Sequence, residues 1–281
     1  MTGLYITEMV ISNGSIFILF TVKKRRQKMV ATTSVALVTG GDKGLGLSMV
    51  QHLARQGVDI IFTYRSNLEG ARKVEKELIQ QGHRVKALQL DVADVGGFDA
   101  FANQVGQTLA QWQVEHFNFL VNNAGIGIYA SLMETTEDQF DALVNIHFKG
   151  VFFLTQKLVP LMADGGRILN ISTGLTRFCL PGYAAYAAMK GAIEVLTRYQ
   201  ATELADRKIT VNTLAPGAIE TDFGGGAVRD NNEINHYIAS VTALGRAGRP
   251  DDIGGVVAAL LGPDTGWINA QRIEASGGMK L

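Results

Sequence analysis

Tyr186 and Lys190 are separated by four positions within the segment Tyr183–Lys190. If this segment is helical, the two side chains project from the same face, one turn apart. A free phenol titrates near ~10, and an adjacent ammonium group favours the phenolate and lowers that pKa. We therefore expect Lys190 to lower the pKa of Tyr186 and to make the phenol a proton donor. Because a Tyr-x-x-x-Lys pattern also arises by chance, its meaning depends on the elements that position it.

Those elements alternate between short apolar runs and helical segments of ten or more residues. Buried strands are expected at 35–38, 60–63, 85–90, 119–122 and 167–171. Helices are expected at 47–55, 68–81, 97–111 and, as one long and bent helix, 136–162. This alternation predicts an α/β fold with a Rossmann-type doubly wound parallel sheet, as a single domain over residues 29–281. Ligands of such sheets bind at the carboxyl ends of the strands, where the pattern places five polar residues: Thr39, Arg65, Asp91, Asn122 and Thr173.

A glycine-rich turn joins the first predicted strand to the first predicted helix. Its sequence is Thr39-Gly40-Gly41-Asp42-Lys43-Gly44-Leu45-Gly46. Glycines allow the backbone to approach a pyrophosphate, and a helix N-terminus offers unpaired N–H groups. The turn therefore predicts a dinucleotide site.

The residues after the second strand indicate which dinucleotide is bound. About 20 positions after the glycines, a fold that reads a free 2′-hydroxyl places an acidic residue. Here that position is Tyr64, Arg65 and Ser66 follow it, and Lys43 adds a cation within the glycine turn. Arginine binds phosphate oxygens through its paired N–H groups. We expect NADP rather than NAD, although both cations could instead be solvated surface charges.

Composition excludes several other classes of protein. The formal net charge is zero, so no nucleic-acid partner is expected. Cys179 is the single cysteine, which excludes internal disulfides and is consistent with a cytoplasmic location. The five histidines show no metal-ligand spacing, and no metal site is expected.

Residues 1–28 differ from the rest of the chain. The apolar run Ile16–Phe20 is much shorter than the ~20 residues of a membrane span, and the basic cluster Lys23–Arg26 follows it rather than preceding it. We expect a flexible extension, or a start at Met29; a membrane anchor is the minor alternative. Removal of residues 1–28 should leave solubility and activity intact.

From about residue 32 to the C-terminus, the chain resembles the short-chain dehydrogenase/reductase family, in particular ketoreductases of the 3-oxoacyl-carrier-protein reductase kind. The matching parts are the glycine turn, Asp91, the turn Asn122–Gly125, the Tyr186/Lys190 pair, the stretch Pro216–Thr221 and the last strand region 268–278. The resemblance implies that Tyr186 exchanges the substrate proton, while Lys190 binds the nicotinamide ribose and lowers the tyrosine pKa. The cofactor-binding positions it implies are Gly40, Asp42, Lys43, Gly44, Leu45, Gly46, Arg65, Ser66, Asp91, Val92, Asn123, Ala124, Gly125, Tyr186, Lys190, Pro216, Gly217, Ile219 and Thr221.

Two positions depart from the family pattern. The family serine lies 13 residues before the tyrosine, which here gives Thr173. Successive strand residues point to opposite faces, so we assign the substrate-orienting hydroxyl to Thr173, with Ser172 as the fallback. Family members also have an asparagine three residues before Gly150, where His147 stands, and Asn145 lies two residues earlier. A neutral imidazole could relay a proton there, or His147 could only pack.

The segment after Thr221 is rich in glycine and is expected to form a lid over the substrate, from about 222 to 245. Phe178, Leu180, Tyr183 and Phe223 suggest a partly apolar pocket, although they could also be core or subunit contacts. No cluster of cations for an acidic substrate is evident.

Together these observations predict an NADP(H)-dependent oxidoreductase that transfers hydride between nicotinamide and a small-molecule carbonyl or secondary alcohol. The catalytic candidates are Tyr186, Lys190, Thr173, Ser172 and His147. The alternatives are a sugar dehydrogenase, a catalytically weak NADP(H)-binding sensor or scaffold, and an enzyme tethered to a membrane. The resemblance also implies a homo-oligomer, commonly a tetramer.

Overall fold

In the computed structural model, residues 5–12, 15–21 and 34–281 are described, and two units are distinguished. In the first, β1 (Tyr5–Ser12) pairs antiparallel with β2 (Ser15–Thr21), which contains the apolar run noted in the sequence. The predicted start at Met29 lies outside the described residues. The second unit begins at Ser34 and contains all the candidate site residues.

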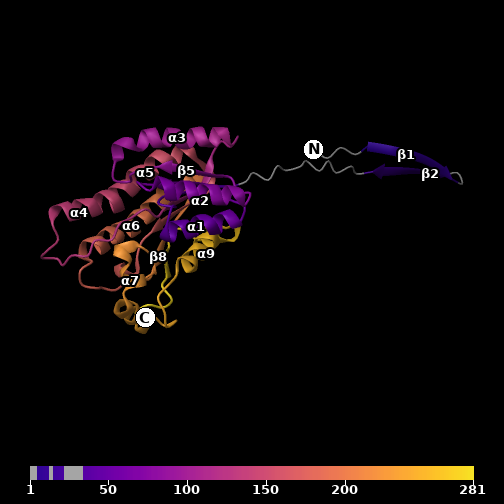
Figure 1. The fold of residues 1–281 in the computed structure, drawn as a ribbon. Coiled ribbons are helices and arrows are strands. Elements are labelled where there is room, and N and C mark those ends of the chain that lie inside the picture. Colours follow the sequence, from indigo (N-terminus) through magenta and orange to yellow (C-terminus); the bar gives the residue numbers. More distant parts are fainter. Residues whose placement is uncertain (1–4, 13–14, 22–33) are drawn as a thin grey trace. The chain divides into compact units, whose positions relative to one another are not determined.

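The second unit is built on a seven-stranded parallel sheet (Figure 1). Its strand order is β5-β4-β3-β6-β7-β8-β9, which reverses direction between β3 and β6. Ligands of doubly wound sheets bind at this reversal point. The strands are β3 (Val35–Val38), β4 (Asp59–Tyr64), β5 (Val85–Gln89), β6 (Phe117–Asn122), β7 (Met162–Ile171), β8 (Thr210–Pro216) and β9 (Arg272–Ala275).

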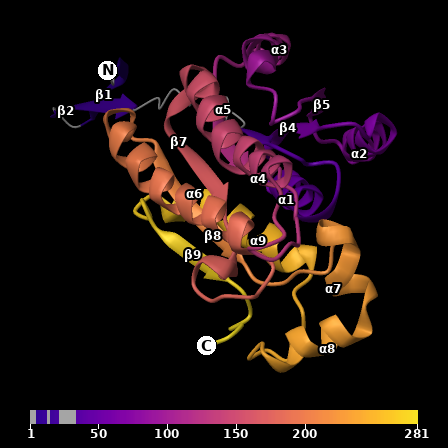
Figure 2. The ribbon, with the colours of Figure 1, turned by 90° about the vertical axis from the view of Figure 1, so that its left-hand side faces the viewer.

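Helices cover both faces of the sheet, which confirms the predicted doubly wound α/β architecture (Figures 1 and 2). One face carries α1 (Gly44–Arg55), α2 (Leu68–Gln80) and α9 (Pro250–Leu261). The other carries α3 (Phe98–Gln111), α5 (Gly150–Leu158) and α6 (Ala184–Glu203). Strand β3 supplies both cores, because its residues alternate between the two faces and all four are fully buried.

The long, bent helix expected over 136–162 is present as one continuous helical stretch with a π-helical turn inside it. It consists of α4 (Glu137–Val144), a π-helical turn (Asn145–Lys149) and α5, followed by a short 3₁₀ turn (Val159–Leu161). Pro160 lacks a backbone N–H and cannot continue the helix, so the chain turns there and β7 begins at Met162, earlier than predicted. The π-helical turn contains both Asn145 and His147, and it places His147 against Tyr186.

The segment expected to form a lid folds as a 3₁₀ turn (Phe223–Gly226) and two short helices, α7 (Ala227–Asp230) and α8 (Asn232–Ser240). Figure 2 shows α7 and α8 side by side, outside the two helical layers. This segment begins with the glycine-containing turn after Thr221.

Candidate active site

Tyr186 and Lys190 lie on one face of α6, as predicted. Both side chains are buried, each with 6% of its surface exposed. The Nζ atom of Lys190 donates a hydrogen bond to the carbonyl oxygen of Ile171 at 2.7 Å, and it lies 5.8 Å from the centroid of the Tyr186 ring. The end of β7 thus fixes the lysine beside the tyrosine.

The expectation that Lys190 lowers the pKa of Tyr186 is wrong for this structure. Burial raises the pKa of Tyr186, and this effect exceeds that of the hydrogen bond to the Thr173 side chain, which lowers it. Burial also lowers the pKa of Lys190 to about 8. Desolvation penalises the charged form of each group, so the phenol of Tyr186 is neutral and keeps its proton at neutral pH.

The two hydroxyls at the end of β7 have different surroundings. Ser172 is 3% exposed, and its Oγ donates to Oε1 of Glu194 at 2.8 Å. Thr173 is half-buried and hydrogen-bonds with Tyr186, and its Oγ1 also accepts from the backbone N–H of Leu175. The geometry therefore supports Thr173 rather than Ser172 as the hydroxyl that faces the substrate.

His147 packs directly against Tyr186. The ring centroids are 5.2 Å apart and the planes meet at 86°. Its Nε2 lies 2.8 Å from the carbonyl oxygen of Ile126, and within residues 34–281 its buried Nδ1 has no hydrogen-bond partner. Burial, assisted by the charge of Lys190, lowers the pKa of His147 to about 3, so the imidazole is neutral. A neutral ring held in this way supports the position of Tyr186.

The glycine turn has the geometry of a phosphate cradle. Helix α1 begins at Gly44 with no acidic residue in its first turn, and Asp42 lies in the turn that precedes it, where its carboxylate interacts with its own backbone. A Cβ atom at Gly46 would overlap the carbonyl oxygen of Gly40, so only glycine fits there. The amide of Asn123 donates to the carbonyl oxygens of Thr39 (2.8 Å) and Gly40 (3.2 Å), and it joins the end of β6 to this turn.

The residues predicted to bind the adenosine end lie at the carboxyl ends of β4 and β5. Arg65 and Ser66 are exposed, and so is Lys43 in the glycine turn. Within residues 34–281, neither Arg65 nor Lys43 takes part in an ion pair. Two cations are thus available to an anionic group.

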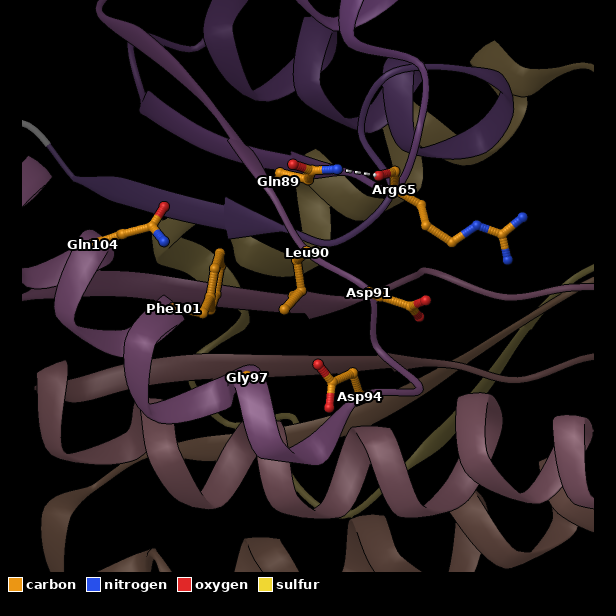
Figure 3. Close-up of a pocket in the computed structure, with 8 residues that line it drawn as sticks. All are labelled: Arg65, Gln89, Leu90, Asp91, Asp94, Gly97, Phe101 and Gln104. Carbon is orange, nitrogen blue, oxygen red and sulfur yellow. Dashed lines mark hydrogen bonds between the residues drawn. The ribbon is translucent and has the colours of Figure 1, made fainter.

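A cavity of about 450 Å³ adjoins this end of the sheet (Figure 3). Arg65 and Asp91 were predicted as site residues, and Figure 3 shows the Arg65 side chain extending away from Gln89, which hydrogen-bonds its backbone. The sequence prediction missed the remaining lining residues, which are Gln89, Leu90, Asp94, Gly97, Phe101 and Gln104. The last three share a face at helical spacing, a signal that could have revealed them.

The stretch that follows β8 reaches the glycine turn through Thr221. Gly217 donates its backbone N–H to the carbonyl oxygen of Ala275 at 3.1 Å, and Ile219 forms a bridge with Gly248. Thr221 is buried, lies next to Gly44, and accepts a hydrogen bond from the N–H of Phe223. Of the predicted nicotinamide-side residues, Thr221 is therefore brought beside the glycine turn, while Gly217 and Ile219 contact Ala275 and Gly248.

The remaining predicted residues occupy the junctions between these parts. Asp91 accepts a hydrogen bond from the N–H of Ala93 and caps the turn after β5. The carbonyl group of Val92 packs against Gly150, where a side chain would collide with it. Ala124 donates its N–H to Oγ1 of Thr39, and Gly125 lies against the ring of His147.

Of the side chains proposed for the pocket, the structure brings only some together. The rings of Tyr183 and Phe223 face Tyr186, at centroid distances of 6.4 and 5.7 Å. Phe178 instead packs against Arg177 and belongs to a small separate cluster with Ile238. Tyr129 contacts Tyr183 at 5.4 Å, and the sequence prediction missed it because it is distant in the chain.

The arginines near the lid are all paired within the second unit. Arg177 binds Glu274, Arg229 binds Asp222 and Asp230, and Arg246 binds Asp252. Among the described residues, no helix is long and apolar enough to cross a membrane.

Comparison with known proteins identifies relatives over nearly the whole second unit. A family model described as enoyl-(acyl carrier protein) reductase matches residues 40–280. A probable tetrahydroxynaphthalene reductase of Zymoseptoria tritici is 33% identical over 257 residues, which are 86% of this chain and 93% of the relative.

Solved structures show the same similarity. The promiscuous reductase LugOII, which catalyses keto-reduction at C1 during lugdunomycin biosynthesis, is 35% identical with a TM-score of 0.83, covering 88% of this chain and 98% of that one. A short-chain dehydrogenase of Burkholderia cenocepacia in complex with NADP is 33% identical with a TM-score of 0.80, covering 87% of this chain and 97% of that one. With the glycine turn, the Tyr186/Lys190 pair and the parallel sheet in the expected places, the chain belongs to the short-chain dehydrogenase/reductase family and is an oxidoreductase.

Proposed function

We propose that this protein is an NADPH-dependent ketoreductase that converts a small-molecule ketone to a secondary alcohol. The observation that carries the proposal is the convergence of Tyr186, Lys190 and Thr173 at the end of β7, beside the glycine turn. The solved relative that is described in complex with NADP, and the relatives named as reductases, support the same cofactor and reaction class.

The residues present fit NADP(H). Gly46 allows the start of α1 to pack directly against the carbonyl oxygen of Gly40, and the N-terminus of α1 in this turn would bind a pyrophosphate. Arg65 and Lys43 would bind the 2′-phosphate, because both are exposed cations outside any ion pair of the second unit. The stretch from Pro216 to Thr221 would contact the nicotinamide end.

Each catalytic side chain has a task that its environment supports. When bound, the nicotinamide would supply the hydride for the carbonyl carbon. Tyr186 donates its proton to the carbonyl oxygen, and its raised pKa keeps the phenol protonated at neutral pH. Thr173 donates a hydrogen bond to the same oxygen, and Lys190, with a pKa of about 8, carries a positive charge at pH 7 that stabilises the developing alkoxide.

We assign His147 a positioning role rather than a relay role. Its pKa of about 3 keeps it neutral at the pH of catalysis, and its Nε2 is already bound to Ile126. If His147 relayed a proton, His147→Ala would lower turnover and would also shift the pH profile of alcohol oxidation. Loss of turnover in Asn145→Ala, with His147→Ala active, would instead assign the relay to the start of the π-helical turn.

The exposed apolar side chains of α5 and α6 support a homo-oligomer, which we propose is a tetramer. Phe152, Val195 and Tyr199 are 41%, 46% and 63% exposed. Light scattering coupled to size-exclusion chromatography measures the mass directly, and a monomer at micromolar concentration would contradict the proposal.

The test of function is NADPH oxidation followed optically with a panel of diketones, β-ketoesters and cyclic ketones, beside Tyr186→Phe. We expect turnover with at least one ketone, abolition of turnover in Tyr186→Phe, and unchanged NADPH binding by fluorescence in that variant. Because the matching family model is described as an enoyl reductase, the panel includes an enoyl thioester. Turnover of that compound alone would replace the ketoreductase proposal.

Two other results would favour the alternative functions. Tight NADPH binding without turnover of any compound would indicate a sensor or scaffold. Oxidation of glucose with NADP⁺, without ketone reduction, would indicate a sugar dehydrogenase.

A further inference from the structure

Tyr186 lies within a group of aromatic rings that come from separate segments of the chain. Phe223 of the lid turn meets it at 5.7 Å with planes tilted by 56°. Tyr183, just before α6, lies at 6.4 Å and 67°, and Tyr129 from the loop after β6 contacts Tyr183 edge to face at 5.4 Å. We call Tyr129, Tyr183 and Phe223 the aromatic wall.

Glycines at specific positions permit this arrangement. A Cβ atom at Gly127 would meet the ring of Phe223, and one at Gly182 would collide with the ring of Tyr129. Gly182 also has a φ of +89°, which favours glycine. The N–H of Ala130 donates to the carbonyl oxygen of Gly182 at 2.9 Å, so the loop that carries Tyr129 is fixed to the loop that precedes Tyr186. The Tyr129 and Tyr183 part of the wall is therefore held by a backbone contact as well as by side-chain packing.

The rings of the wall remain partly open to solvent. Tyr129 is 72% exposed and Phe223 44% exposed, whereas Tyr186 is 6% exposed. Phe223 is followed by Gly224, Gly225 and Gly226, each with a positive φ, so this ring is attached to a segment with few steric restrictions. Exposed rings around a buried proton donor offer π-faces to a ligand whose reacting atom reaches Tyr186.

Within residues 34–281, the arginines around the segment after Thr221 offer no free cation to an acidic ligand at this wall. The lid arginines Arg177, Arg229 and Arg246 are all paired with carboxylates in the second unit. A ligand recognised by the wall would gain from ring contacts rather than from ion pairs.

We propose that the aromatic wall selects flat aromatic ketones of two or more fused rings, with the carbonyl group directed to Tyr186. The inference rests on the proposed ketoreductase function, and Tyr129, Tyr183 and Phe223 are its specificity-determining residues. Offset-stacked or edge-to-face ring pairs are favoured beyond the burial of their area, so each ring of the wall contributes separately.

The test compares 2-tetralone with 2-decalone, which have the same carbon skeleton and differ in the aromatic ring. We expect kcat/KM for 2-tetralone to exceed that for 2-decalone by about tenfold or more in the unmodified protein. Phe223→Leu and Tyr129→Leu should each lower the ratio about three- to tenfold, mainly through the constant for 2-tetralone. Equal constants for the two ketones would overturn the inference and leave the ketoreductase function intact.

Matched control variants separate the wall from general effects of losing an aromatic ring. Phe152 and Tyr199 are 41% and 63% exposed and contact none of the rings around Tyr186 among the described aromatic pairs. Phe152→Leu and Tyr199→Leu should keep the substrate ratio. A fall in the ratio of the same size in these controls would overturn the assignment.

A binding measurement tests the inference even without turnover. Calorimetry with 2-naphthol and with 2-decalol, in the presence of NADP⁺, reports recognition alone. We expect 2-naphthol to bind at least tenfold more tightly, and Phe223→Leu to reduce that difference. Equal binding of the two alcohols would overturn the proposed role of the aromatic wall. Tight binding of 2-naphthol with no reduction of either ketone would overturn only the ketoreductase function.

Discussion

The ammonium nitrogen of Lys190 lies 5.8 Å from the centre of the Tyr186 ring and 2.7 Å from the carbonyl oxygen of Ile171, to which it donates a hydrogen bond. Both groups are buried, and burial moves their pKa values in opposite directions: upward for Tyr186 and downward for Lys190. Each shift favours the neutral form of its group. These shifts make the stability of the folded protein depend on pH.

Lys190 should make the protein more stable as the pH rises above 8. The pKa is about 8 in the folded state and 10.5 in the reference state, so between these values the unfolded chain binds more protons. The free energy of unfolding therefore increases with pH across that window. Urea denaturation at pH 7.5 and 9.5 should show this increase in the unmodified protein and a smaller one in Lys190→Met. Tyr186 acts in the opposite direction, but only above about pH 10.

His147 should produce a loss of stability on acidification. Its pKa falls from 6.5 to about 3 on folding, so below pH 6.5 the unfolded chain binds a proton that the folded protein does not. Stability present at pH 7 is lost as the pH decreases through this window, by at most about 1.4 kcal/mol per pH unit. The variant His147→Asn should therefore show a smaller decrease between pH 7 and pH 5. Identical decreases in both proteins would mean that the ring is accessible to water.

Much of the fold could be predicted because its sheet is buried on both faces. Strand β3 is a continuous apolar run and β4 contains the run Ile60–Phe62, and a polar residue, Thr39 or Arg65, follows each strand at its carboxyl end. The helical face shared by Tyr186 and Lys190 follows from spacing alone.

The features that could not be predicted depend on tertiary contacts. Nothing local in Asn145–Lys149 distinguishes a π-helical turn from an α-helix, because it contains neither proline nor glycine. The pKa of Tyr186 depends on burial, which a sequence does not show, and so the predicted direction was wrong. The contact of Tyr129 with Tyr183 joins loops more than 50 positions apart and depends on Gly182.

Arg65 and Lys43 should determine the preference for NADPH over NADH. Both are exposed and outside the ion pairs of the second unit, and a charge-assisted hydrogen bond to a 2′-phosphate is stronger than a neutral one. Arg65→Ala and Lys43→Ala should each raise the KM for NADPH about tenfold and leave that for NADH nearly unchanged. Arg72→Ala on α2, another exposed arginine, is the matched control. Equal changes with both cofactors would place the 2′-phosphate elsewhere.

We expect Thr173 to contribute to catalysis and Ser172 to contribute to the stability of the fold. Thr173 hydrogen-bonds with Tyr186, so Thr173→Val, which keeps the shape and removes the hydroxyl, should lower kcat/KM on the order of 10- to 100-fold, while Thr173→Ser should stay active. Ser172 instead donates to Glu194, which Arg272 and Thr176 also bind, so Ser172→Ala should cost about 1 kcal/mol of stability and leave turnover nearly unchanged. Steady-state kinetics and urea denaturation of the three variants test both statements. If Ser172→Ala lost turnover while Thr173→Val kept it, the roles of the two hydroxyls would be reversed, and the face of β7 that meets the substrate would be the one that carries Ser172.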